Sequence, residues 1–347
     1  MEILALLRFI ALLSILIFVH EGGHFLIARL FGVAVEEFGF GIPPRMWGKK
    51  IGGTIYSLNL LPIGGFVRLK GEEGETLGFG GADSFAVQSK LKRVGIVAAG
   101  ALGNLFLAWI VFYLLWGIGK TVAAGKVLVN EVSVGSPAYS VGLAEGDFIL
   151  SFNEERVETA EELLSLTKES LGQTAKLGFE RDGEAVSVSI VPRADPPGGE
   201  GPLGVGITTA TKEEKAPFWQ VPWFGLRETF QTLTAMLKGL GQTVGSLFRG
   251  EEVMVGGPVA IYAFSKVYAD GFKPFIDFMA LLSLNLVVVN LLPIPALDGG
   301  RILFIGIEAI RRKKLSPRTE ATINSVGLAA LIVLIVLLSV RDIRTFF

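Results

Sequence analysis

Four long apolar stretches constrain the fold of this 347-residue chain more than any other feature of its sequence. They cover residues 3–30, 94–119, 278–297 and 321–340, and the last three contain no charged residue. A helix needs about 20 mostly apolar residues to cross the hydrocarbon core of a bilayer, so each stretch is long enough. We therefore predict a polytopic α-helical membrane protein with four transmembrane helices.

The composition agrees with a membrane protein and excludes several other classes. Hydrophobic residues make up 50% of the chain and charged residues only 19%, whereas soluble domains carry about 25% charged residues. The 32 basic and 33 acidic residues leave a net charge of −1, so we expect no nucleic-acid partner. The chain has no cysteine, which excludes disulfides, cysteine-ligated zinc and thiol catalysis.

Basic residues in the connecting segments predict the orientation in the membrane. Residues 311–318, between the third and fourth stretches, contain five basic residues out of eight and should lie in the cytoplasm. With four spans, both termini are then extracytoplasmic. The segment 31–93 is expected on the cytoplasmic side, which agrees with its eight lysines and arginines. The long segment from about residue 120 to 275 is expected outside.

Both histidines of the chain lie in one short motif, H-E-G-G-H at residues 20–24, inside the first apolar stretch. Residues four apart lie on one face of a helix, so His20 and His24 can bind one metal ion while Glu21 reaches a water molecule. A pair of core histidines with a buried salt bridge is the alternative, but three ionisable groups inside a span cost about 2.5–3.5 kcal/mol each. Gly22 and Gly23 provide either close helix packing or room for a substrate backbone.

A catalytic zinc ion usually has three protein ligands, and with no third histidine and no cysteine the third should be a carboxylate. The segment N-L-L-P-I-P-A-L-D-G-G at residues 290–300 supplies Asp298, at a membrane depth similar to that of the two histidines. Alternatively, Asp298 only ends the apolar run as a turn residue. Glu308 is a weaker candidate ligand.

Two prolines in the same segment, Pro293 and Pro295, should break the helix before Asp298. Irregular backbone is tolerated at membrane depth only when it is buried in protein or lines a cavity. The freed backbone, together with the Asn290 side chain, is suited to hydrogen-bond an extended peptide. Asn290 is equally suited to hold two helices together.

The two motifs together resemble the site-2 protease family of intramembrane zinc metalloproteases, and are most similar to its bacterial regulator-of-sigma-E protease branch. Residues 38–41 and 61–67 resemble the membrane-associated β-loop of that branch, residues 99–106 its second-span motif, and residues 257–261 a further patch. One departure is Ala101, where the branch usually has a proline. It concerns helix packing rather than metal binding.

The resemblance implies one Zn²⁺ per chain with His20, His24 and Asp298 as ligands, Glu21 as the catalytic acid and base, and Asn290 as a substrate-binding residue. It also implies hydrolysis of a peptide bond in the transmembrane segment of a single-span protein. Substrates of the family include anti-sigma factors that another protease has already trimmed outside, and remnant signal peptides. The implied location is the bacterial plasma (inner) membrane, with the active site towards the cytoplasmic leaflet.

Residues 120–194 have the pattern of a small extracytoplasmic α/β domain. Strands are predicted at 127–132 and 148–153, a helix at 160–171, and a hairpin around Asp182-Gly183. The pattern G-S-P-A…G-L-x-x-G-D resembles a bacterial PDZ domain, and PDZ domains bind peptides by strand addition. The partner would be a peptide or the ectodomain of a substrate. A passive plug that only obstructs access is the alternative.

Leucine and phenylalanine recur at helical spacing after a Pro- and Gly-rich linker at residues 195–202. The stripe of residues 226, 230, 233, 237 and 240 predicts an amphipathic helix on the outer membrane surface, although a core-packing stripe is equally possible.

The predicted organisation combines these segments. Its boundaries are transmembrane helix 1 at 1–30, the β-loop region at 31–93, transmembrane helix 2 at 94–119, the PDZ domain at 120–194, linker and surface helix at 195–275, transmembrane helix 3 at 276–310, a basic cytoplasmic loop at 311–320, and transmembrane helix 4 with a tail at 321–347. Two rival functions remain: a zinc-bound membrane scaffold that does not cleave, and a transporter. A transporter predicts inverted repeats, which the sequence does not show.

Overall fold

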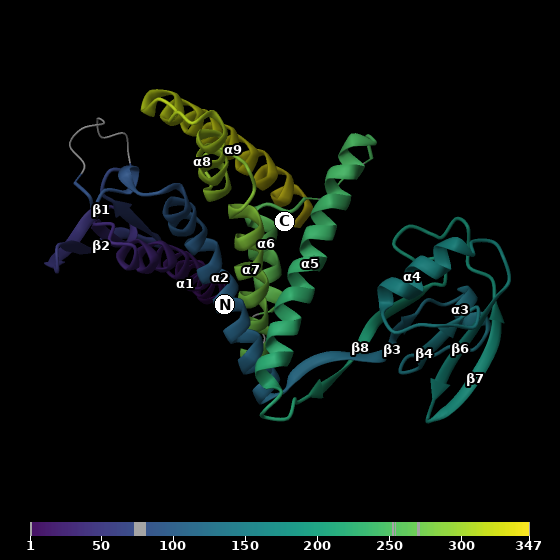
Figure 1. Ribbon diagram of the computed structural model, residues 1–347. Coiled ribbons are helices and arrows are strands. Elements are labelled where there is room, and N and C mark those ends of the chain that lie inside the picture. The colour runs from purple at the N-terminus through teal and green to yellow at the C-terminus, as the bar shows by residue number, and fades with distance from the viewer. Residues whose placement is uncertain (1, 73–80, 252, 254, 269–270, 347) are drawn as a thin grey trace. The chain divides into compact units, whose positions relative to one another are not determined.

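The computed structural model describes residues 2–72, 81–251, 253, 255–268 and 271–346 (Figure 1). The chain divides into two compact units. Unit 1 comprises Met1–Gly117 and Pro217–Phe347, and unit 2 comprises Ile118–Ala216. Unit 2 is therefore an insertion into the chain of unit 1, as the sequence predicts for the α/β domain.

Four helices of unit 1 are long and apolar enough to cross a membrane, and they lie where the sequence predicts spans. They are α1 (Glu2–Leu30), α2 (Lys90–Ile118), α7 (Phe272–Asn290) and α9 (Pro317–Phe346). In α9, none of the most apolar 18-residue window is buried inside the protein. An exposed apolar surface of this length needs lipid as its partner.

The third predicted span, residues 276–310, consists of two helices separated by the expected break. Helix α7 ends at Asn290, and α8 (Asp298–Arg311) begins after an irregular segment that contains Pro293 and Pro295. The helix break before Asp298 is confirmed. A Cβ at Gly299 would lie 2.1 Å from the Leu292 carbonyl oxygen, so only glycine lets α8 begin so close to this segment.

A two-stranded antiparallel hairpin follows α1, in the region where the sequence predicts a β-loop. Its strands are β1 (Val35–Ile51) and β2 (Thr54–Leu69), and their register shifts several times along the ladder. Phe38 of β1 packs between two rings of α1. The centroid of its ring lies 5.2 Å from that of Phe18 and 5.0 Å from that of Phe25. The hairpin therefore lies against the helix that carries both histidines.

Helix α5 (Val221–Phe248) packs against α2 and α7 through a different face from the one that the leucine stripe predicts. Val221, Gly225 and Thr229 are buried, whereas Leu226 and Phe230 are exposed. The reason is a close backbone approach, because a Cβ at Gly225 would lie 2.8 Å from the Tyr113 backbone nitrogen. Small residues thus form the packed face, and the expectation of a core-packing leucine stripe is wrong. Helix α6 (Pro258–Val267) precedes α7.

Unit 2 is a mainly antiparallel sheet with two short helices. The sheet has the strand order β7-β6-β4-β3-β8, with β5 paired to β4. The elements are β3 (Lys120–Val132), α3 (Pro137–Ser140), β4 (Phe148–Phe152), β5 (Glu155–Arg156), α4 (Ala160–Glu169), β6 (Ala175–Arg181), β7 (Glu184–Ile190) and β8 (Val205–Glu214). The predicted helix and hairpin are confirmed. The fully buried side chains of Val127, Ile149, Phe152 and Leu177 belong to the unit's own core.

The predicted domain boundary at residue 194 is too early. The chain continues past the Pro- and Gly-rich stretch at 195–202 into β8, which pairs with β3, for example Ile207 with Val129. The stretch therefore connects two parts of one sheet and is not a linker to the membrane. Its turn-forming composition predicts a loop, but cannot tell whether the chain returns to the same sheet.

The buried carboxylate of Asp147 predicts how the stability of unit 2 depends on pH. Burial disfavours its charged form, but hydrogen bonds from Arg181 and from the Ala144 backbone N–H outweigh this effect and place the pKa of Asp147 below its ordinary value. This stabilisation is present above the unfolded-state pKa, about 3.9. We expect this stabilisation to be lost as the pH falls from there through the folded-state pKa of Asp147. The measurement is the thermal unfolding midpoint of a protein with residues 118–216, followed as a function of pH.

Variants of the basic partners provide the control. Arg181→Ala should lower the unfolding temperature at pH 7 and flatten the pH dependence, because Asp147 then loses its charged partner. Lys176→Ala should leave both unchanged, since Lys176 pairs with Glu154 in an exposed position. An Arg181→Ala protein with the wild-type pH dependence would contradict the assignment.

Candidate metal centre

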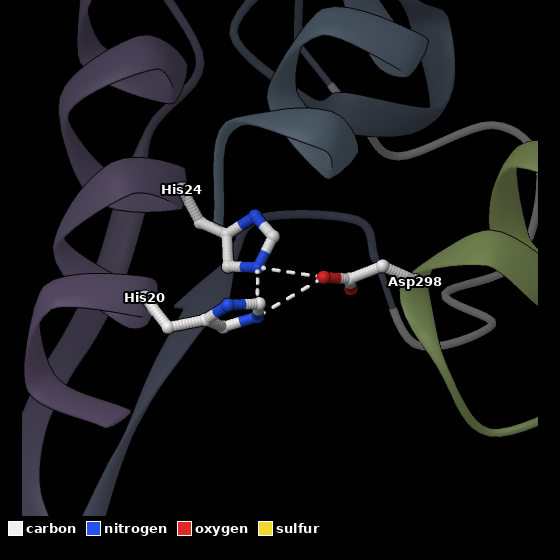
Figure 2. Close-up of side chains that lie close together, drawn as sticks. All are labelled: His20, His24 and Asp298. Carbon is white, nitrogen blue, oxygen red and sulfur yellow. Dashed lines mark hydrogen bonds and ion pairs between the residues drawn. The ribbon is translucent and has the colours of Figure 1, made fainter. Parts of the chain in front are cut away.

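The structure brings His20, His24 and Asp298 together in unit 1 (Figure 2). The two imidazoles leave α1 one turn apart, and Asp298 is the first residue of α8. Asp298 Oδ2 lies 3.0 Å from His20 Nε2 and 3.4 Å from His24 Nε2, and the two Nε2 atoms are 3.2 Å apart. Both histidines are buried, each with 8% of its surface exposed. The i, i+4 spacing and the helix break before Asp298 account for this convergence.

The second ring nitrogen of His24 determines what the cluster can bind. His24 Nδ1 lies 2.8 Å from the Ile96 carbonyl oxygen, which only accepts, so in the neutral ring Nδ1 donates and Nε2 presents a lone pair. Asp298 Oδ2 is buried and has no hydrogen-bond partner among the described residues. A cation held between His20 Nε2, His24 Nε2 and Asp298 Oδ2 would satisfy all three atoms in this buried place. Two imidazoles and one carboxylate fit a catalytic zinc ion, which takes three such ligands.

Helix α2 forms one wall of the cluster and leaves space for it. A Cβ at Gly100 would lie 2.3 Å from His24 Nε2 and 2.6 Å from His20 Nε2. Any side chain at this position would occupy the place where the lone pairs meet. Sequence reasoning did not assign Gly100 to the site. The available signal was its spacing with Gly103 inside an uncharged span.

The two glycines of the H-E-G-G-H motif have different roles. A Cβ at Gly23 would lie 2.1 Å from the Ala99 carbonyl oxygen of α2, so Gly23 serves close helix packing. Gly22 has no neighbouring atom within 4 Å of its Cβ position, and it lies two residues from each histidine, on the other side of α1. The close-packing alternative therefore applies to Gly23 and not to Gly22.

Glu21 leaves α1 towards the hairpin. The Val67 backbone N–H of β2 donates a hydrogen bond to Glu21 Oε2, at 3.0 Å. Glu21 also interacts electrostatically with both histidines and with Asp298. The carboxylate is thus held beside the cluster without being one of its three converging groups, which suits a group that transfers protons rather than one that binds the metal.

Two other candidate residues lie outside the cluster. Glu308 is about 15 Å further along α8 and pairs with Arg93 at 2.6 Å, so its assignment as an alternative metal ligand is wrong. Asn290 is the last residue of α7 and is partly buried. Its side chain makes no hydrogen bond within the described part of the chain. It is therefore available to a ligand at the irregular segment that follows.

An apolar groove runs along the part of α1 that precedes His20. It has a volume of about 480 Å³ and lies between α1 and the hairpin. Ser14 on α1 donates a hydrogen bond to the Pro62 carbonyl oxygen of the hairpin at 2.9 Å, and both residues line the groove. The lining residues are Leu7, Ile10, Ala11, Ser14, Ile15, Phe18, Phe40 and Pro62. The groove thus ends less than one turn before His20.

Comparisons with known proteins identify relatives that span nearly the whole chain. A Clostridium perfringens protein is 35% identical over 350 residues, which cover 98% of each chain. The regulator of sigma-W protease RasP of Bacillus subtilis is 28% identical over 420 residues, with 98% of each chain covered. Among solved structures, the PDZ domain of an SdrC-like protein from Listeria monocytogenes is 22% identical with a TM-score of 0.23, covering 25% of this chain and 90% of that chain.

The family model of Peptidase family M50 matches residues 8–334, which include all of the residues that form the candidate centre. The chain is also 28% identical over 420 residues to the zinc metalloprotease RasP of Geobacillus kaustophilus. This match covers 99% of this chain and 98% of RasP. Since one family model and full-length relatives span nearly the whole sequence, the chain belongs to peptidase family M50 and is a membrane metalloprotease of the site-2 protease family.

Proposed function

We propose that this protein is a zinc-dependent intramembrane endopeptidase that hydrolyses peptide bonds in the transmembrane segments of single-span proteins. One observation carries the proposal: two imidazole nitrogens and a carboxylate oxygen converge beside Glu21, in helices with the length and hydropathy of membrane spans. The proposed stoichiometry is one Zn²⁺ per chain, held by His20, His24 and Asp298.

The protein residues divide the chemistry between them. A bound zinc ion supplies Lewis-acid chemistry that activates water and polarises a carbonyl group. The hydrogen bond from Val67 N–H holds Oε2 of Glu21, and this fixes the direction of the carboxylate. Glu21 takes the proton of the attacking water and passes it to the nitrogen of the leaving amine, as a general base and then a general acid.

A helical substrate must first expose a peptide bond, because its carbonyl groups are hydrogen-bonded within the helix. The apolar groove along α1 offers a surface for such a helix. The hairpin beside α1 offers a strand edge for an extended chain, whereas the backbone N–H groups of the irregular segment after Asn290 already donate hydrogen bonds within the protein. The free Asn290 side chain supports its role in binding the substrate chain.

Orientation and partners complete the proposal. The basic segment 311–318 supports a cytoplasmic position for the loop before α9. Both termini and unit 2 would then be extracytoplasmic, in the bacterial inner membrane, with the centre towards the cytoplasmic leaflet. We propose unit 2 as a PDZ domain, whose edge strand β8 is available to a peptide or a substrate ectodomain. Anti-sigma-factor-like proteins trimmed by an upstream protease, or remnant signal peptides, are the proposed substrates.

A zinc-bound scaffold that does not cleave is the second candidate. It needs the three converging groups but has no use for Glu21. The hydrogen bond from Val67 that orients this carboxylate favours the enzyme.

Two variants test the function directly. Glu21→Gln should keep one zinc per chain and lose cleavage of a model single-span substrate in detergent, by at least about 100-fold. Asp298→Ala should lose zinc as well as cleavage, since only two ligands remain. Metal analysis and a gel-based cleavage assay measure both effects. Full cleavage by Glu21→Gln would disprove the mechanism, and normal zinc content in Asp298→Ala would disprove the ligand assignment.

A pair of glycine variants tests the wall of the centre. Gly100→Ala places a methyl group within 2.3 Å of His24 Nε2, so we expect it to lose zinc while alanine keeps α2 helical. Gly22→Ala is the matched control, because its Cβ position is open, and it should keep zinc. Metal analysis of both purified proteins decides. Equal zinc contents would show that Gly100 is not needed for the metal.

Filling the apolar groove tests the substrate path. Ala11→Phe should raise KM for a transmembrane substrate about tenfold or more, since a single blocked apolar contact is worth roughly 1–3 kcal/mol, and zinc content should stay normal. Leu102→Phe on α2, which is exposed and does not line the groove, should behave as the wild type. An unchanged KM for Ala11→Phe would place the substrate elsewhere.

A further inference from the structure

An ion pair joins the hairpin to the helix that carries Asp298. Glu72 follows the end of β2, and its carboxylate pairs with Arg301 of α8. The second oxygen of the same carboxylate accepts a hydrogen bond from the Leu69 backbone N–H, at 3.3 Å. Arg301 lies three residues after Asp298, less than one turn along α8. Glu72 thus connects the last residue of β2 to the first turn of α8.

The same end of β2 holds Glu21. Val67, which donates to Glu21 Oε2, is two residues before Leu69. A continuous series of contacts therefore runs from Glu21 through the end of β2 and Glu72 to Arg301, and from there to Asp298. Glu21 and Asp298 come from helices nearly 280 residues apart in sequence, and the hairpin is the element that contacts both of their neighbourhoods.

Exposure indicates what this ion pair contributes. The Glu72 side chain is 13% exposed and that of Arg301 is 40% exposed. Partly exposed pairs add little to stability, whereas a bridge between two elements restricts their relative position. A second pair, Arg93 with Glu308, ties the other end of α8 to α2 and is more buried, at 12% and 10%. Only the first pair leads to Glu21.

We infer that Glu72 and Arg301 are positioning residues that align the Glu21 carboxylate with the groups that bind the metal. The inference rests on the proposed function and adds two residues to it. Neither residue is one of the converging groups or contacts them through a hydrogen bond in the described part of the chain. Their effect on the reaction is exerted through Val67 on one side and through the first turn of α8 on the other.

A double-mutant cycle on the full-length protein tests the inference. Glu72→Gln and Arg301→Gln should each lower kcat about 10- to 100-fold, the range expected for a misplaced catalytic group. KM should change less than twofold, and each protein should keep one zinc per chain. The double variant should be no slower than either single variant, because both remove one interaction. Arg301→Lys should recover part of kcat by restoring the charge.

The second ion pair provides the matched control. Arg93→Gln and Glu308→Gln should lower the thermal unfolding midpoint while kcat stays within about threefold of the wild type. Multiplicative losses of kcat in the double variant, loss of zinc from Glu72→Gln, or an equal loss of kcat in the control variants would each overturn the inference.

A spin-label measurement decides the same point without catalysis. The chain has no cysteine, so Met46→Cys on the hairpin and Ile310→Cys on α8, both exposed, give one defined label pair. Glu72→Gln should broaden the distance distribution between the labels, and an unchanged distribution would overturn the inference. A wild-type protein that holds zinc but cleaves no substrate would instead overturn the proposed function.

Discussion

Three polar side chains that meet at one buried point form the constraint on which the rest of this structure depends. His20 Nε2, His24 Nε2 and Asp298 Oδ2 lie within 3.4 Å of one another, and a cation held between them would satisfy all three. Placing such groups in an apolar span is costly. The surrounding helices therefore have to meet at fixed positions, because a ligand that moves away leaves an uncompensated polar group in an apolar environment.

Close backbone contact is how unit 1 satisfies this constraint. Gly23 and Gly100 let α1 and α2 approach until the Ile96 carbonyl accepts from His24 and the ligand nitrogens have space in front of them. Gly299 does the same for the turn that begins α8. Within a membrane, helices gain little from hydrophobic burial against one another, so small residues at their contacts are the usual means of association. Here the same residues also shape the candidate metal site.

The hairpin adds a second requirement, since a metal site alone does not transfer protons. It contacts α1 through aromatic rings, holds Glu21 through Val67, and reaches α8 through Glu72. The apolar groove lies between this hairpin and α1. One element thus borders the proposed substrate path and orients the proposed general base. Unit 2 has a hydrophobic core of its own.

The sequence by itself determined the spans, the helix break before Asp298 and the shared helix face of His20 and His24, because apolar length, proline and i, i+4 spacing are local properties of the chain. That Asp298 meets the two histidines was decided by the packing of α8 near α1. The tertiary structure alone decided that Gly23 packs while Gly22 faces open space, that α5 packs through Gly225 rather than its leucines, and that β8 returns to the sheet of unit 2. The physical reason is that each of these outcomes depends on which backbone another element presents at the contact, and periodicity along one segment contains no information about its neighbour.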